Sequence, residues 1–167
     1  QAMGLRHDTR TATLVYEYNF AADEFHTLMF GGGVEGRSGR FGTETEFDQR
    51  RMNLVAYGED RMQVFDNLTV TGGGRVEKSG PYAVVGMPRA SARYELRPGV
   101  FLHGSGGMAA VAPTLGQRFE DTFQLRGNPD LRLSRSSSFD GGLSAVFWEE
   151  RARADITGYK HDYEDLI

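Results

Sequence analysis

The chain lacks cysteine entirely, which excludes disulfide bridges, zinc–thiolate sites and thiol catalysis. It also lacks a basic surplus, because 19 Lys and Arg stand against 23 Asp and Glu, for a formal net charge of -4. Phosphate binding normally needs such a surplus, so nucleic acid is not expected as a partner. Runs of about 18 uncharged apolar residues are absent too, which argues against a membrane-spanning helix.

Glycine, by contrast, is abundant. The 167 residues include 22 Gly beside 11 Phe and 7 Tyr, a composition that favours tight turns and close contacts between strands. The length fits one domain or one piece of a larger one. We interpret residues 1–4 as a cloning remnant and place residues 5–167 in the fold.

Alternation of apolar and polar residues with period two dominates the chain. In Thr11–Phe20, for example, Leu14 and Tyr16 share one face, opposite Glu17. The pattern predicts an all-β fold, an antiparallel up-and-down meander of about eight long strands, with at most a helical turn within Leu115–Phe123. The expected strands are Thr11–Phe20, Thr27–Glu35, Arg51–Glu59, Leu68–Glu77, Arg89–Leu96, Val100–Met108, Ser138–Phe147 and Ala152–Thr157.

Short and long links alternate between these strands. The short links are expected near Ala21–Glu24, after Glu59, at Arg97–Gly99 and at Glu149–Glu150, and the long ones at Gly36–Arg50, Lys78–Pro88 and Ala109–Ser136. Short turns at one end and long loops at the other are typical of an outer-membrane β-barrel. A soluble β-sandwich alternates in the same way, but its strands are usually shorter, nearer six residues than ten.

Four sequence features occur in order toward the C-terminal part of the chain. They are the paired strands Asn53–Glu59 and Leu68–Arg75, Met-Ala-Ala-Val-Ala-Pro-Thr-Leu at Met108–Leu115, Gly-Asn-Pro-Asp-Leu at Gly127–Leu131, and the strand end Tyr159–Ile167. Together they resemble the late barrel region of TonB-dependent outer-membrane receptors. Two departures concern the ligand subfamily. Arg132–Ser134 stands where the family has Lys/Arg-Pro-Glu, and Ala110–Val111 replaces a Phe-Arg pair.

The resemblance implies a transport protein of the bacterial outer membrane that takes up siderophores, cobalamin or a similar scarce nutrient. It also implies an N-terminal plug domain that TonB engages and a barrel of about 22 strands. The chain is therefore expected to be a partial barrel, without the plug and the final strands. Its two edge strands would then be unpaired unless the sheet closes into a small barrel or two copies dimerise edge to edge.

The longest link is the candidate ligand-binding segment, because it mixes aromatic and charged residues. This composition suits a polar, partly aromatic solute such as a metal chelate; lipopolysaccharide phosphates and a plain solvated loop fit it too. The candidate residues are Arg118, Phe119, Glu120, Asp121, Phe123, Arg126 and Asn128.

An amphipathic aromatic girdle at the membrane interface is a further expectation, since outer-membrane lipid would surround the barrel. Aromatic residues that lie near the predicted strand ends are its candidates: Tyr18, Phe20, Phe25, Tyr57, Tyr94, Phe147 and Trp148. A soluble core would place aromatic residues there as well.

Motifs for catalysis, a cofactor or a metal are weak. Gly31, Gly33 and Gly36 have the spacing of a dinucleotide fingerprint, but a polar link is expected after them instead of a helix. The acidic pairs Glu120–Asp121 and Glu149–Glu150 fall in links where they would be solvated. The four histidines, His7, His26, His103 and His161, are widely spaced.

We therefore expect no enzyme, no cofactor and no metal site. The alternative to the receptor is a stand-alone β-barrel or a soluble ligand-binding β-module. An outer-membrane barrel enzyme would need a nucleophile or a carboxylate cluster at the rim, which the sequence does not supply.

Overall fold

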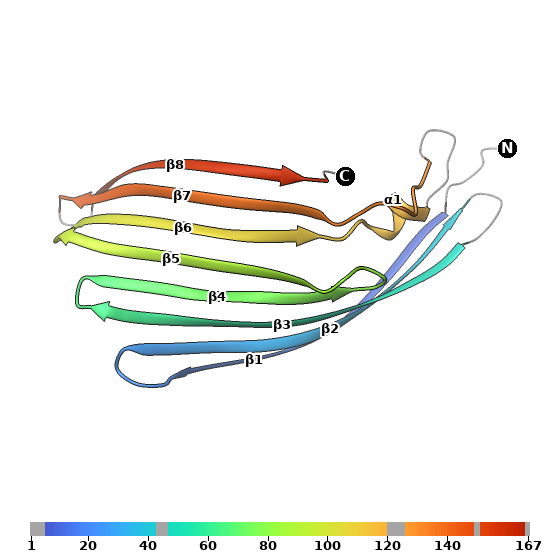
Figure 1. Cartoon of the computed structure of the whole chain (residues 1–167), viewed down its shortest axis with the longest axis horizontal. Helices are drawn as coiled ribbons and strands as arrows, with labels where there is room; N and C mark the ends of the chain where they lie inside the picture. The colour runs from blue at the N-terminus through green and yellow to red at the C-terminus, as the bar shows by residue number, and fades with distance from the viewer. Residues whose placement is uncertain (1–5, 43–46, 120–125, 149–150, 166–167) are drawn as a thin grey trace.

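The computed structural model describes residues 6–42, 47–119, 126–148 and 151–165. In these ranges, eight antiparallel strands form one sheet in which each strand pairs with its neighbours in sequence, as Figure 1 shows. The strands are β1 (Arg6–Ala21), β2 (His26–Gly42), β3 (Phe47–Phe65), β4 (Leu68–Ser79), β5 (Val85–Arg97), β6 (Val100–Val111), β7 (Ser134–Phe147) and β8 (Ala152–Glu164).

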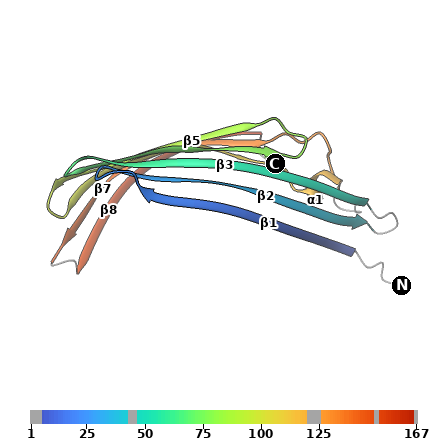
Figure 2. The ribbon, with the colours of Figure 1, turned by 90° about the horizontal axis from the view of Figure 1, so that it is seen from below.

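The predicted eight-strand meander is confirmed, and the β-sandwich alternative is wrong because the described strands make a single layer. The sheet is bowed, with β1 and β8 bent to the same side of the central strands (Figure 2). Within the described ranges β1 pairs only with β2, and β8 pairs only with β7, so the sheet is open and not a closed small barrel. Dimerisation through the edges stays a prediction.

The strands are longer than expected, and the link predicted at Gly36–Arg50 is wrong for most of its length. β2 continues to Gly42 and β3 begins at Phe47, with Gly36 paired to Met52. A tilted membrane crossing needs about 9–11 residues, whereas β3 has 19. The added stretches Gly36–Gly42 and Phe47–Arg50 contain few apolar residues, so their sequence does not alternate.

The other two long links are also shorter in the structure than predicted. The chain between β4 and β5 spans only Gly80–Val84, and that between β6 and β7 spans 112–133. β3 runs on to Phe65, so the link expected after Glu59 is the two-residue turn Asp66–Asn67. Glu149–Glu150 lies outside the described residues.

Asp23 fixes the short turn between β1 and β2. Its Oδ1 accepts the backbone N–H of Phe25 at 2.8 Å and that of His26 at 2.7 Å. These bonds favour the carboxylate, and the Phe25 N–H is the main cause that holds the pKa of Asp23 below its ordinary value. Together with the backbone bond from the Ala22 N–H to the His26 carbonyl at 2.9 Å, the Asp23 side chain specifies the turn.

The two faces of the sheet differ in polarity, as the alternation predicted. One face carries apolar rows such as Leu14–Val34–Leu54, which are direct cross-strand partners. Its side chains are exposed, to 71% at Leu14 and 76% at Ile156. The opposite face carries polar rows such as Glu35–Asn53–Ser79.

A soluble-type core is lacking in the described ranges, where Leu115 is the buried hydrophobic residue and Pro113 the large, fully buried side chain. Pro113 precedes the helix α1 (Leu115–Phe119), and Leu115 is its first residue. The helix confirms the helical turn that was predicted within Leu115–Phe123. No helix in the described part of the chain has the length and apolar character to cross a membrane.

Aromatic rings cluster on the apolar face near the short turns. Tyr18, Phe20 and Phe30 lie with ring centroids 5.5–6.2 Å apart. Tyr57 was expected near a strand end, and this is wrong: it lies in the middle of the extended β3, on the polar face, where its hydroxyl donates to Glu17 at 3.0 Å. The interfacial role of the other aromatic residues stays a prediction.

Candidate functional site

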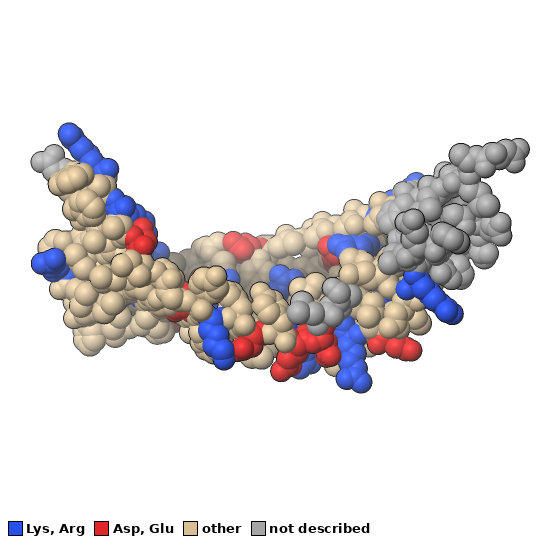
Figure 3. All heavy atoms as spheres, turned by 90° about the horizontal axis from the view of Figure 1, so that it is seen from above, with Lys and Arg blue, Asp and Glu red and all other residues tan. Residues whose placement is uncertain are grey.

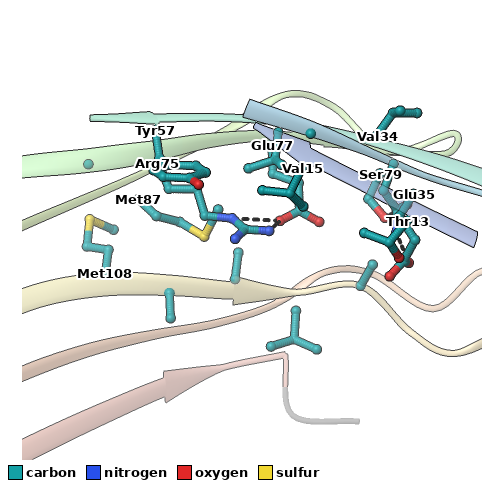
Figure 4. A pocket seen from close by; sticks show the side chains of 18 of the residues that line it. Thr13, Val15, Val34, Glu35, Tyr57, Arg75, Glu77, Ser79, Met87 and Met108 are labelled. Carbon is teal, nitrogen blue, oxygen red and sulfur yellow. Dashed lines mark hydrogen bonds and ion pairs between the residues drawn. The ribbon is translucent and has the colours of Figure 1, made fainter. Parts of the chain in front are cut away.

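The polar face forms a hollow of about 920 Å³. Side chains of β1 to β6 line the same space, so this is the concave face of the bowed sheet (Figure 4). Acidic and basic side chains lie beside one another along the molecule (Figure 3). The polar residues of the lining are Thr13, Glu17, Glu35, Arg37, Arg51, Asn53, Tyr57, Arg75, Glu77, Ser79 and Arg89.

Two carboxylates of the hollow have close partners. Arg75 donates to Glu77 Oε2 from Nη2 at 2.7 Å and from Nε at 3.1 Å, as the dashed lines in Figure 4 mark. Glu17 accepts the hydroxyl of Tyr57 at 3.0 Å and the amide of Asn19 at 3.1 Å. Both carboxylates therefore already have hydrogen-bond partners within the protein.

The third carboxylate, Glu35, lies at the end of the hollow nearer the long loops. Asn53 donates to Glu35 Oε1 at 2.9 Å, and the buried Ser79 hydroxyl donates to Asn53 Oδ1 at 2.7 Å. Arg37 Nη2 approaches Glu35 Oε1 at 3.2 Å. One carboxylate thus serves both an amide and a guanidinium.

Polar contacts continue toward the short turns. Arg89 pairs with Glu59 at 2.5 Å, and Arg153 pairs with Asp155 through two bonds of 2.7 and 2.9 Å. Ser144 donates to Asp155 at 2.5 Å and lies 3.5 Å from His103 Nδ1. Asp155 therefore contacts the serine and not the histidine, which is not the order of a nucleophile, base and orienting acid.

The segment after β6 folds back against the sheet. Arg51, only 7% exposed, donates from Nη1 to the carbonyl of Pro113. Thr114 and Gln117 then cap α1 reciprocally: the Gln117 N–H donates to Thr114 Oγ1 at 3.1 Å, and the Thr114 N–H donates to Gln117 Oε1 at 2.8 Å. α1 contacts β2.

A second tether joins this segment to the link between β4 and β5. The hydroxyl of Tyr82 donates to the carbonyl of Leu131 at 3.1 Å. Arg118 lies over the Tyr82 ring, 5.5 Å from its centroid, and donates to the carbonyl of Pro129 at 2.7 and 3.1 Å. Two links that are separated in sequence are thereby held together.

Part of the predicted ligand-binding set is brought together here. Arg118 stacks on Phe119 at 4.8 Å, and the N–H of Asn128 donates to the carbonyl of Gln117 at 3.0 Å. Arg126 is exposed. The other three candidates, Glu120, Asp121 and Phe123, lie outside the described residues.

Sequence reasoning missed Arg51 and Tyr82. Their partners Pro113 and Leu131 are 62 and 49 positions away, so no local pattern links them. The sequence signal available was the Ala-Pro-Thr-Leu segment itself, which begins next to Pro113.

The histidines remain separate from one another where they are described. His26 Nδ1 lies 2.8 Å from Asp60 Oδ2, His103 lies 3.3 Å from Thr157, and His161 lies between the rings of Tyr159 and Tyr163. Among the described residues, no three His, Asp or Glu side chains gather to hold a metal ion.

The comparisons with known proteins agree with this geometry. The family model described as TonB dependent receptor-like, beta-barrel matches residues 2–167. A search of curated protein sequences gave no match.

Solved structures share the fold. The siderophore receptor PirA from Pseudomonas aeruginosa superposes with a TM-score of 0.84 at 18% identity, over 94% of this chain and 32% of that one. A variant of the ferric enterobactin receptor from the same organism superposes with a TM-score of 0.82 at 16% identity, over 95% of this chain and 27% of that one. The copper transporter OprC superposes with a TM-score of 0.75 at 16% identity, over 96% of this chain and 30% of that one. The chain thus spans about a third or less of the length of these structures.

Proposed function

We propose, from the premise that this chain belongs to the TonB-dependent receptor-like β-barrel family, that its sheet is part of the wall of a transport receptor in the bacterial outer membrane. This family comprises receptors and not enzymes. Because the chain spans about a third or less of the solved structures, the remaining wall strands and the plug belong to the larger receptor in this proposal, and residues 5–167 supply eight strands.

The two-faced sheet is the observation that carries the proposal. Its apolar face exposes large side chains, among them Leu14 at 71%, Tyr16 at 66% and Ile156 at 76%. Exposed apolar area on this scale calls for a partner surface, and lipid satisfies it without hydrogen bonds. The opposite face carries charged side chains that line the hollow. Such a face suits the wall of an aqueous interior.

The proposed cargo is a metal chelate such as a ferric siderophore, or cobalamin or a similar scarce nutrient. Of the structures with this fold, one is named as a siderophore receptor, one as a ferric enterobactin receptor and one as a copper transporter. In this proposal TonB supplies energy through the plug. The long segment contacts the cargo through Arg118, Phe119, Glu120, Asp121, Phe123, Arg126 and Asn128.

Deletion and complementation of the natural gene that encodes this sequence test the proposal. We expect the protein in the outer-membrane fraction, and we expect deletion to abolish uptake of at least one radiolabelled ferric chelate from a panel. Uptake should also require TonB. A soluble location, or unchanged uptake of every chelate, would contradict the proposal.

A point variant tests the loop assignment. Arg126→Ala should raise the chelate concentration that gives half-maximal uptake. Among the candidate ligand-binding residues that the structure describes, Arg126 is the exposed cation. The control is Arg97→Ala, an exposed arginine at the end of β5 beside a short turn. An equal effect of the two substitutions would count against the assignment.

A further inference from the structure

Two arginines face each other across neighbouring strands at one end of the hollow. Arg37 of β2 and Arg51 of β3 are direct cross-strand partners, and both line the hollow. A guanidinium is charged at every ordinary pH, and like charges placed directly opposite each other destabilise a sheet. The pairing calls for a compensating negative charge.

Both side chains also keep a buried donor without a partner. The Nε atoms of Arg37 and Arg51 are buried and make no hydrogen bond in the described part of the chain. Arg51 Nη1 donates to the carbonyl of Pro113, and Arg37 Nη2 reaches Glu35. A buried N–H that stays unpaired is costly, so the pair is incomplete as it stands.

The carboxylates of the hollow do not complete it. Glu77 is taken by Arg75, and Glu17 by Tyr57 and Asn19. Only Glu35 of the three lies against the pair, and it also accepts the amide of Asn53. Among the described residues that line the hollow, one carboxylate therefore faces two guanidinium groups.

We propose that Arg37 and Arg51 form a binding site for an anionic oxygen group, a carboxylate, phenolate or phosphate, carried by the solute that enters the hollow. Arginine forks bind such groups through paired, charge-assisted hydrogen bonds. The site lies on the concave face, opposite the exposed apolar face, so membrane phosphates do not reach it. The inference rests on the proposed function and specifies its cargo as anionic.

Binding measurements on the complete natural protein in detergent test the site. The probes are an anionic ferric tris-catecholate complex, a neutral ferric tris-hydroxamate complex and inorganic phosphate. Arg37→Gln should weaken the binding of the anionic probes about tenfold, the effect of losing one charge-assisted hydrogen bond. It should leave binding of the neutral complex unchanged.

A second variant, which is expected to strengthen binding, distinguishes loss of the site from misfolding. Glu35→Gln removes the one carboxylate at the pair and should strengthen binding of the anionic probes. Arg153→Gln is the matched control, since Arg153 is paired with Asp155 and does not line the hollow. It should change nothing.

The binding measurements test the anion site separately from the proposed transport function. Equal binding of the anionic probes to all variants, or no binding of any anionic probe, overturns the site, while chelate uptake by cells judges the transport function independently. Competition between phosphate and the anionic complex at the site supports it, and shows that a free anion can also occupy it.

Discussion

At the scale of single residues, Gly80 shows how backbone geometry specifies this structure. Its φ of +53° lies in the left-handed region that favours glycine. A Cβ at this position would lie 2.9 Å from Arg51 Cγ, and Arg51 is buried. The Gly80 N–H donates to the carbonyl of Met52 at 2.9 Å, so the chain cannot turn away without losing a bond.

Gly80→Ala should therefore destabilise the protein by roughly 1–3 kcal/mol, because it combines a left-handed non-glycine residue with a close contact. Thermal unfolding of the complete protein in detergent measures the effect. Gly72→Ala is the matched control, since a Cβ at Gly72 meets nothing within 4 Å. Equal unfolding temperatures for the two variants would contradict the explanation.

Residue roles were harder to predict than residue positions. The motif around Pro113 contributed to the resemblance to the family, and Arg118 was predicted as a ligand contact because the longest link mixes aromatic and charged residues. The structure shows that Arg118 already donates to Pro129 and stacks on Tyr82. Composition identifies a residue that can bind a polar group, but it cannot tell whether the chain itself supplies that group.

At the scale of elements, the link between β4 and β5 clamps the segment between β6 and β7. Tyr82→Phe removes the hydroxyl that donates to Leu131 and keeps the ring under Arg118. We expect a loss of about 1 kcal/mol of local stability, the usual net value of one hydrogen bond. Limited proteolysis should then cut within Gly127–Leu133 sooner than in the wild type.

Tyr16→Phe provides the comparison for this clamp, because Tyr16 lies on the exposed apolar face at 66% exposure. It should leave the rate of cleavage in the same segment unchanged. If Tyr82→Phe is cleaved no faster than Tyr16→Phe, the hydroxyl does not hold the segment.

Elements were predictable wherever one face of a strand is apolar. Arg89–Leu96 alternates cleanly, and β5 contains it. Gly36–Gly42 belongs to β2 but reads Gly-Arg-Ser-Gly-Arg-Phe-Gly, which has no apolar row. Its backbone pairing with β3 is a long-range property of the sheet, so a period-two pattern cannot reveal it.

At the scale of the whole molecule, the two faces of the sheet have different surroundings in the proposed receptor. Neighbouring residues in one strand should meet different media: Leu54 points to the apolar face, whereas Asn53 and Val55 point to the hollow. The overall arrangement was predicted from the sequence because period-two alternation marks most of the strands. The bow of the sheet and the hollow required the structure.

The most direct test uses the absence of cysteine from this chain. Single cysteines placed in turn at Asn53–Gly58 of the complete protein, in a background without other cysteines and in lipid vesicles, would carry a spin label. We expect labels at 54, 56 and 58 to collide with lipid-soluble oxygen, and labels at 53, 55 and 57 not to do so. Uniform accessibility along the strand, or the reverse alternation, would contradict a sheet with one face in lipid.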